Sequence, residues 1–126
     1  MSFRHYNPNP DHNRVGDCTV RALSEALGMS WEDTYWLICG EGALQYDMPS
    51  GDAVWGAVLK MAGFQKRTIP DTCPACYSVR QFADDHPQGV YVVVVASHVL
   101  TVRDGDYYDT WDSGDEVPIY YYFREE

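Results

Sequence analysis

The stretch "VYVVVVASHVLTVRDGDYYDTW", residues 90–111, predicts three consecutive β-strands. Residues 90–95 are apolar at every position, a pattern typical of a strand that is buried on both faces in the middle of a sheet. Asp104-Gly105 favours a two-residue hairpin turn between the second strand and the third. Because strands joined by short links pair antiparallel, this stretch predicts the centre of an antiparallel sheet.

The residues before this sheet show helical periodicity. Apolar residues share one helix face over residues 18–27, where Asp17 is a good N-cap and Gly28 a stop signal. Further helices are predicted over residues 30–39 (ended by Gly40), 51–62 (capped by Ser50) and 78–86. Residues 1–16 and 40–49 are expected to be irregular, and two more strands are expected at 64–70 and 117–123. Helices that precede strands indicate one α+β domain over residues 1–126.

Charge and hydropathy limit the partners of the chain. It carries 19 acidic and 9 basic residues, a net charge of −10, and such a surface repels nucleic-acid phosphates and anionic lipid. The longest apolar run, residues 90–96, is too short to span a bilayer, and the polar N-terminal residues do not resemble a signal peptide. We therefore expect a cytoplasmic protein without a nucleic-acid or membrane partner, whose oligomeric state the sequence leaves open.

The four cysteines are expected to be reduced thiols in that compartment: Cys18, Cys39, Cys73 and Cys76. The last two form a "CPAC" motif, which has the spacing of half a zinc site or of a redox pair. No second pair of ligands accompanies it, and no strand and long helix flank it as a redox site requires. We therefore expect no metal and no cofactor, and interpret Cys73 and Cys76 as structural.

Cys18 differs from the other cysteines because it stands at the predicted start of a helix. Unpaired amides and the helix dipole stabilise a thiolate at this position, and the same amides can bind an oxyanion. A nucleophilic cysteine also needs a base within hydrogen-bond reach. Free cysteine is otherwise among the most buried residue types, so a packed, inert Cys18 is the alternative interpretation.

His98 is the candidate base, because it begins a strand in the densest apolar region of the chain and a polar ring there needs a partner. With a two-residue turn, Asp109 becomes a diagonal neighbour of His98 on the same sheet face as Trp111. A three-residue turn would bring Asp112 to His98 instead. Because Asp-Gly favours the two-residue turn, Asp109 is the predicted partner of His98, and Trp111 is placed to shield their bond from water.

The chain order Cys18, His98, Asp109 resembles that of papain-fold cysteine peptidases. Three segments carry the resemblance, and they are similar to small bacterial and phage proteins related to the double-glycine leader peptidases of bacteriocin exporters: "GDCTVRALSEALG", "GVYVVVVASHVLTV" and "DGDYYDTWDSGDE". The resemblance implies a papain-like fold, with N-terminal helices packed on a C-terminal antiparallel sheet. It also implies hydrolysis of an amide bond in a peptide or protein substrate, with Cys18 as nucleophile, His98 as general base and Asp109 orienting the ring.

The oxyanion donor departs from the pattern of that family. These enzymes usually carry a glutamine a few residues before the cysteine, and no glutamine precedes Cys18. Asn13 offers an amide at roughly suitable spacing and is the candidate donor. Two other functions stay open: a catalytically inactive binding module on the same fold, and a deamidase or transglutaminase-like acyl-transfer enzyme that uses the same three side chains.

Overall fold

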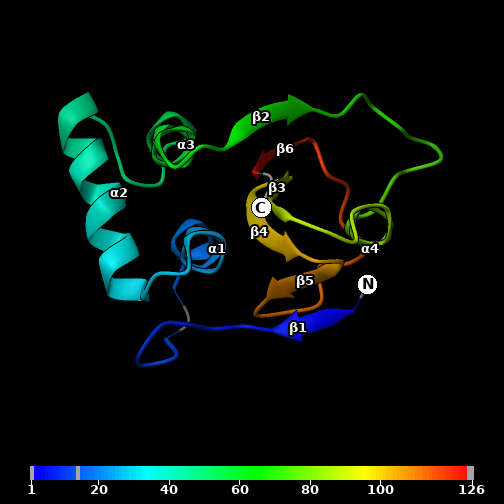
Figure 1. The fold of residues 1–126 in the computed structure, drawn as a ribbon, viewed down its shortest axis with the longest axis horizontal. Helices are drawn as coiled ribbons and strands as arrows, with labels where there is room; N and C mark the ends of the chain where they lie inside the picture. The colour runs from blue at the N-terminus through cyan, green and yellow to red at the C-terminus, as the bar shows by residue number, and fades with distance from the viewer. Residues whose placement is uncertain (1, 14, 125–126) are drawn as a thin grey trace.

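The computed structural model describes residues 2–13 and 15–124, which form four helices and a six-stranded mixed sheet, the α+β class that the sequence predicts. In chain order the elements are β1 (Phe3–His5), α1 (Cys18–Leu27), α2 (Trp31–Gln45), α3 (Asp52–Met61), β2 (Gln65–Thr68), α4 (Val79–Asp85), β3 (Val90–Val95), β4 (His98–Arg103), β5 (Asp106–Asp109) and β6 (Tyr120–Arg124). The strand order across the sheet is β1-β5-β4-β3-β6-β2. Figure 1 shows α1, α2 and α3 gathered on one side of the sheet and α4 on the other.

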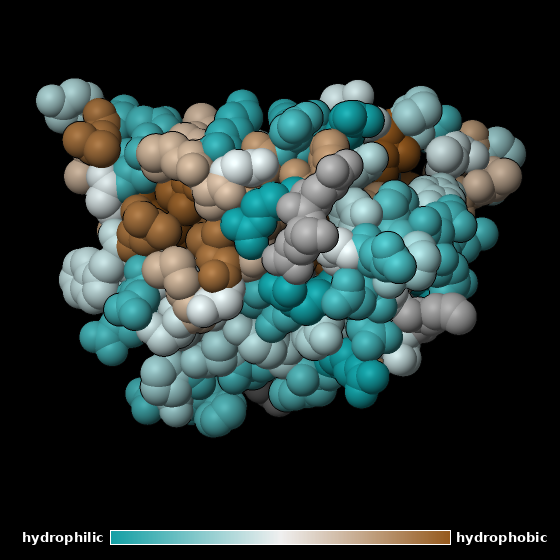
Figure 2. Space-filling view, viewed as in Figure 1, coloured by the Kyte–Doolittle hydropathy of each residue, from teal (hydrophilic) through white to brown (hydrophobic). Residues whose placement is uncertain are grey.

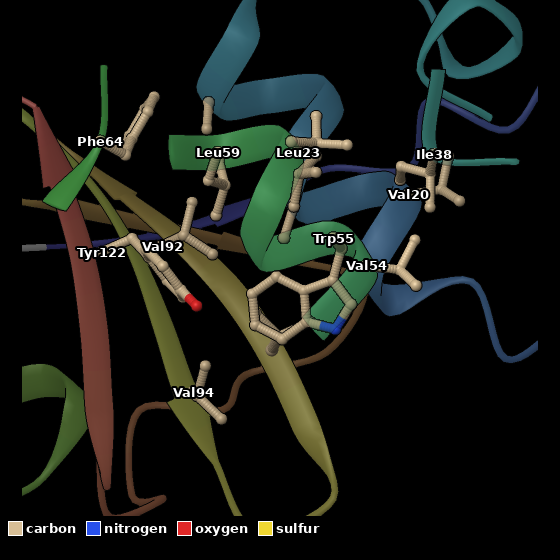
Figure 3. Packing of buried hydrophobic residues seen from close by; sticks show 14 of the residues in the cluster. Val20, Leu23, Ile38, Val54, Trp55, Leu59, Phe64, Val92, Val94 and Tyr122 are labelled. Atoms are coloured by element: carbon tan, nitrogen blue, oxygen red, sulfur yellow. The ribbon is translucent and has the colours of Figure 1, made fainter. Parts of the chain in front are cut away.

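Strand β3 lies in the middle of the sheet, as its unbroken apolar sequence predicts. It pairs antiparallel with both β4 and β6, and only Tyr91 of its six residues is partly exposed. On one face, Val92 and Val94 join a core cluster with α1 and α3, in which the indole of Trp55 reaches toward the strand (Figure 3). On the other face, Val93 packs in a second cluster with Phe82 of α4. The sheet is therefore covered on both faces around β3.

The hairpin between β4 and β5 fixes which side chains of these strands share a face. Asp104 and Gly105 both adopt left-handed backbone, with φ of 50° and 84°, as a type I′ turn requires. Arg103 faces Asp106 directly across this turn, so the predicted two-residue loop is confirmed. Side chains alternate along the strands from this point, which determines the position of every polar group farther along the hairpin.

The N-terminal segment is more ordered than predicted. Phe3–His5 form β1, a parallel edge strand on β5, where irregular structure was expected. The ring of Phe3 contacts that of Tyr107, with centroids 5.7 Å apart, and the Tyr6 amide donates to the Asp109 carbonyl over 2.8 Å. This pairing joins distant parts of the chain, so local composition does not encode it. It holds the N-terminal segment beside Asp109.

Helix α2 is also longer than predicted, because it continues through Gly40 and Gly42 to Gln45. Gly42 is buried against the following loop, and a Cβ there would lie 2.8 Å from the carbonyl oxygen of Asp47. A tertiary contact therefore requires glycine at position 42, and the helix stop predicted at Gly40 is wrong. The helix ends at Tyr46, which adopts left-handed backbone.

The start of α3 differs from the prediction, and the last strand does not pair with the strand before it. Helix α3 begins at Asp52 with Gly51 at the N-cap, so the cap predicted at Ser50 is wrong. The last strand, β6, pairs with β3 and β2 and not with its sequence neighbour β5. Residues 110–119 therefore cross the sheet from the end of β5 to the start of β6. This connection passes close to Asp109, the last residue of β5.

The outer side of α2 and the loop after it expose several large apolar side chains: Tyr35, Trp36, Leu37, Leu44, Tyr46 and Met48. Figure 2 shows hydrophobic residues gathered on this side of the molecule. The helix contacts the core through Thr34, Ile38 and Gly42. Within residues 2–13 and 15–124, none of the helices combines the length and the hydropathy needed to cross a membrane.

Candidate active site

Cys18 is the first residue of α1, at the position predicted from the sequence. Asp17 occupies the N-cap, as predicted, and its side chain makes no capping hydrogen bond. Its carboxylate instead accepts a hydrogen bond from the Trp31 indole over 2.9 Å and pairs with Arg21 one turn along the helix. These charged and indole donors satisfy the carboxylate. The amides of the first turn therefore remain available to an anion near Cys18.

His98 and Asp109 are brought together by the hairpin of β4 and β5, as its register predicts. The two atoms His98 Nε2 and Asp109 Oδ2 lie 2.6 Å apart. The His98 side chain is 12% exposed and that of Asp109 is 2% exposed, so this bond is largely shielded from solvent. An ionised partner in such surroundings forms a strong hydrogen bond and orients the imidazole ring.

The Asp109 carboxylate is itself held by several donors. Oδ2 accepts a second hydrogen bond from Ser113 Oγ over 2.7 Å, and Oδ1 accepts one from the Thr110 amide over 2.8 Å. Arg21 Nη2 lies 3.7 Å from Oδ1. Neither Ser113 nor Arg21 is predicted from the sequence as part of the site. The "DSGDE" segment resembles a solvated turn in sequence, yet Ser113 is fully buried because the connection to β6 folds back over Asp109.

Asp112, the alternative partner of His98, lies elsewhere. Its Oδ1 accepts hydrogen bonds from the Tyr107 hydroxyl over 2.7 Å and from the Gly114 amide over 3.0 Å. Arg80 lies 3.7 Å from the same oxygen. The two-residue turn therefore selects Asp109, and Asp112 instead stabilises the connection that follows β5.

Cys18 and His98 line the same two cavities, although the two residues are far apart in sequence, and each shifts the pKa of the other. Because Nε2 of the ring faces Asp109, Nδ1 is the nitrogen left for the sulfur. Burial by itself would raise the pKa of the Cys18 thiol. The hydrogen bond from His98, the charge of that ring, the Val99 amide and the charge of Arg21 outweigh burial, and they hold the pKa below its ordinary value.

The pKa of His98 moves in the opposite direction. Burial by itself would lower it, but the hydrogen bonds to Asp109 and Cys18 and their negative charges raise the pKa to about 9. A raised imidazole pKa and a lowered thiol pKa both favour the ionic form of the pair. The site can therefore hold Cys18 as thiolate and His98 as imidazolium near neutral pH, with Asp109 as the counter-ion.

Trp111 packs against the His98 ring, with centroids 5.1 Å apart. Its side chain remains 46% exposed, so one part of the indole lies in solvent while another covers the histidine. This is the position predicted from the alternation of side chains along β5. The indole restricts the access of water to the bond between His98 and Asp109.

Two cavities meet at Cys18, and they share Gly16, Cys18, Ser97 and His98. The first, of about 410 Å³, is lined mainly by apolar side chains from α3, β3, β4 and β6, among them Trp55, Val94, Val99 and Tyr120. The second, of about 690 Å³, lies toward the N-terminal segment and Trp111 and is more polar. The sulfur therefore lies where a bound chain could extend to either side.

Asn13, the predicted oxyanion donor, is exposed and lines the second cavity together with Cys18 and His98. The structure thus places its amide in the same cavity as the reacting groups. The N-terminal segment reaches this place because β1 anchors it to β5. The role of Asn13 as an oxyanion donor stays a prediction, and the first-turn amides of α1 are the other candidate donors.

The CPAC motif differs from the prediction. Cys73 and Cys76 form a disulfide in the loop between β2 and α4, whereas reduced thiols were expected. Close spacing allows this bond without any long-range rearrangement. Cys18 and Cys39 are the free cysteines of the chain. In the part of the chain that the structure describes, no group of three or more His, Cys, Asp or Glu side chains is arranged to hold a metal ion.

Comparison with protein-family models, with curated proteins and with solved structures found no match to this chain. The function must therefore be inferred from the site geometry and the chemistry of its residues.

Proposed function

We propose that the protein is a cysteine peptidase or isopeptidase of papain-like architecture, in which Cys18 is the nucleophile. The observation that carries the proposal is the hydrogen bond between His98 and Asp109 beside the two cavities that Cys18 and His98 both line. A cysteine, a histidine and an aspartate can cooperate in acyl transfer. Here they come from the N-terminus of α1, from β4 and from β5, and they lie together in partly buried surroundings. The Cys18 thiol also faces two cavities, whereas an inert packed cysteine would have no cleft beside it.

The geometry supports an acyl-transfer sequence in two halves. The Cys18 thiolate attacks the carbonyl carbon of an amide, and the first-turn amides of α1 stabilise the negative charge on its oxygen. The carbon–nitrogen bond then breaks, and His98 donates its proton to the departing amine, which leaves a thioester on Cys18. In the second half His98 takes a proton from water, the resulting hydroxide attacks the thioester, and the acid product leaves as the thiolate is restored. Asp109 keeps the ring oriented in both halves.

The test combines probe labelling with digestion of a peptide library. The unmodified protein, Cys18→Ser and the matched control Cys39→Ser are incubated with electrophilic peptide and ubiquitin-like probes, and the intact masses are measured. We expect one adduct on the unmodified protein and on Cys39→Ser, and none on Cys18→Ser. We also expect library peptides to be cleaved by the two proteins that retain Cys18.

Each other outcome overturns part of the proposal. Conversion of glutamine side chains to glutamate without chain cleavage would replace the peptidase with a deamidase that uses the same three residues. Equal labelling of Cys18→Ser and Cys39→Ser, or no labelling of either, would remove Cys18 as the nucleophile and favour a binding module on this fold.

A further inference from the structure

Arg21 lies one turn after Cys18 on α1 and faces the sheet and not the solvent. Its side chain is 11% exposed, which is uncommon for arginine. Its Nη1 pairs with the Asp17 carboxylate, and its Nη2 lies 3.7 Å from Oδ1 of Asp109. The Arg21 guanidinium thus lies between two carboxylates. One belongs to Asp17, which directly precedes Cys18, and the other to Asp109, which pairs with His98.

Both carboxylates that Arg21 bridges are nearly buried, with side chains 6% and 2% exposed. Without the guanidinium, Asp17 and Asp109 would be two negative charges of like sign close to the Cys18 thiolate. Such an arrangement opposes ionisation of the thiol and loosens the packing of α1 on β5. The Trp31 indole satisfies Asp17 with one hydrogen bond but brings no compensating charge.

We propose that Arg21 is a positioning residue, which joins the N-terminus of α1 to Asp109 and neutralises Asp17 beside the Cys18 thiolate. The inference rests on the proposed function, because it needs Cys18 to act as a thiolate. It explains how an aspartate can precede the nucleophile directly without suppressing it. It also explains why the side chain of Asp17 does not cap α1.

Several charged or titratable groups surround Cys18, so the inference must be separated from their effects. They come from α1, from the N-terminal segment, from α3 and from the hairpin, and they are Asp17, Arg21, His5, His12, Asp52, His98 and Asp109. Arg21 is the arginine among them, and it contacts the carboxylates of both Asp17 and Asp109. Its removal therefore takes away a positive charge that, like that of His98, lowers the pKa of the Cys18 thiol, while His98 itself stays in place.

The chain offers a matched control in Arg103. This arginine also joins α1 to the sheet, because its Nε donates to Oε1 of Glu25 over 2.9 Å and its Nη2 donates to the Glu25 carbonyl over 2.9 Å. Glu25 lies in the last turns of α1, away from Cys18, and neither residue lines the two cavities. Arg103→Met therefore removes an ion pair between the same helix and the same sheet without touching the site.

The experiment measures the rate of Cys18 alkylation by iodoacetamide against pH, together with thermal unfolding, for the unmodified protein, Arg21→Met, Arg21→Lys and Arg103→Met. We expect Arg21→Met to shift the acid midpoint of the rate profile upward by about one pH unit, so that the rate below it falls about tenfold. Arg21→Lys keeps the positive charge but lacks the planar guanidinium that can contact two carboxylates at once. Its midpoint should therefore lie between those of the unmodified protein and Arg21→Met. Arg103→Met should leave the midpoint unchanged.

A second comparison keeps the inference testable if Arg21→Met does not fold. Adding Asp17→Asn to that variant removes the carboxylate that Arg21 neutralises, and the double variant should recover folding and most of the lost rate. The inference is overturned if Arg21→Met lowers stability but leaves the pH midpoint in place, or if the double variant is no more reactive than the single one. Absence of selective Cys18 alkylation in the unmodified protein would instead overturn the proposed function.

Discussion

Replacement of Asp109 by asparagine isolates the charge behind His98, because it changes the side chain little in shape. In the native site, His98 Nε2 lies 2.6 Å from Oδ2 of a carboxylate whose side chain is 2% exposed. Asparagine can still accept a hydrogen bond from the ring or from Ser113, but it carries no charge. The variant therefore tests whether the Asp109 charge maintains the thiolate–imidazolium pair.

The structure gives the size of the effect. Burial would lower the pKa of His98, yet its hydrogen bonds and the neighbouring charges raise it from 6.5 to about 9. That rise corresponds to about 3 kcal/mol in favour of the imidazolium. When the Asp109 charge is lost, the pKa of His98 should fall, because burial then opposes only the contributions of Cys18. A weaker imidazolium charge raises the pKa of Cys18, and each unit of that rise lowers the thiolate fraction below the thiol pKa about tenfold.

The sign of the linkage decides which measurement is informative. The raised pKa of His98 stabilises the folded protein below 6.5, and this contribution is lost as the pH rises through about 9. The lowered pKa of Cys18 acts in the opposite sense, because it stabilises the fold above 9.0 and this contribution is lost as the pH falls. The two contributions offset each other between these values, so unfolding free energy is a poor readout.

The assay is therefore direct observation of the pair in Asp109→Asn and in the unmodified protein. Nuclear magnetic resonance of the His98 ring reports its protonation, and iodoacetamide alkylation reports the Cys18 thiolate. We expect a smaller protonated fraction of the His98 ring at neutral pH in the variant than in the unmodified protein, and slower alkylation of its Cys18. An unchanged His98 titration and an unchanged alkylation rate in Asp109→Asn would refute the reasoning.

Three further predictions concern the core and the cover of the site. Leu23→Ala removes a fully buried side chain of α1 and should lower the free energy of unfolding by about 2 to 5 kcal/mol in urea titrations, with little loss taken as contrary evidence. Gly56→Ala would place a Cβ 2.4 Å from the hydroxyl of the buried Tyr122, and should cost about 1 to 3 kcal/mol in the same titration. Trp111→Ala should change stability little, because the indole is 46% exposed, but should slow Cys18 alkylation several-fold by admitting water to His98, and an unchanged rate would remove its shielding role.

The sheet centre and the pairing of His98 with Asp109 could be predicted because both depend on local pattern. An apolar run identified β3, and Asp104-Gly105 identified the turn that sets the register of β4 and β5. Once the register is known, side-chain alternation places two distant polar residues on one face. The start of α1 at Cys18 follows in the same way from cap and periodicity signals.

The features that could not be predicted depend on contacts between distant segments. The three residues of β1 carry no strong strand pattern, and they become a strand because β5 offers a free edge. Gly42 acts as a packing residue within α2 only because the following loop approaches its Cα. Burial of Arg21 and Ser113 depends on the packing of α1 and of the last connection around Asp109, which no local signal reveals.

The most direct test of the central claim compares the two free cysteines, Cys18 and Cys39, in the unmodified protein. Both are partly buried, and they differ in that Cys18 contacts a histidine backed by a buried carboxylate. Mass spectrometry of iodoacetamide-treated protein from about pH 5 to about pH 10 gives the alkylation rate of each sulfur. We predict that Cys18 reacts at neutral pH with a midpoint below that of an ordinary thiol, and that it reacts faster there than Cys39. Parallel profiles for the two cysteines, or an inert Cys18, would contradict the account.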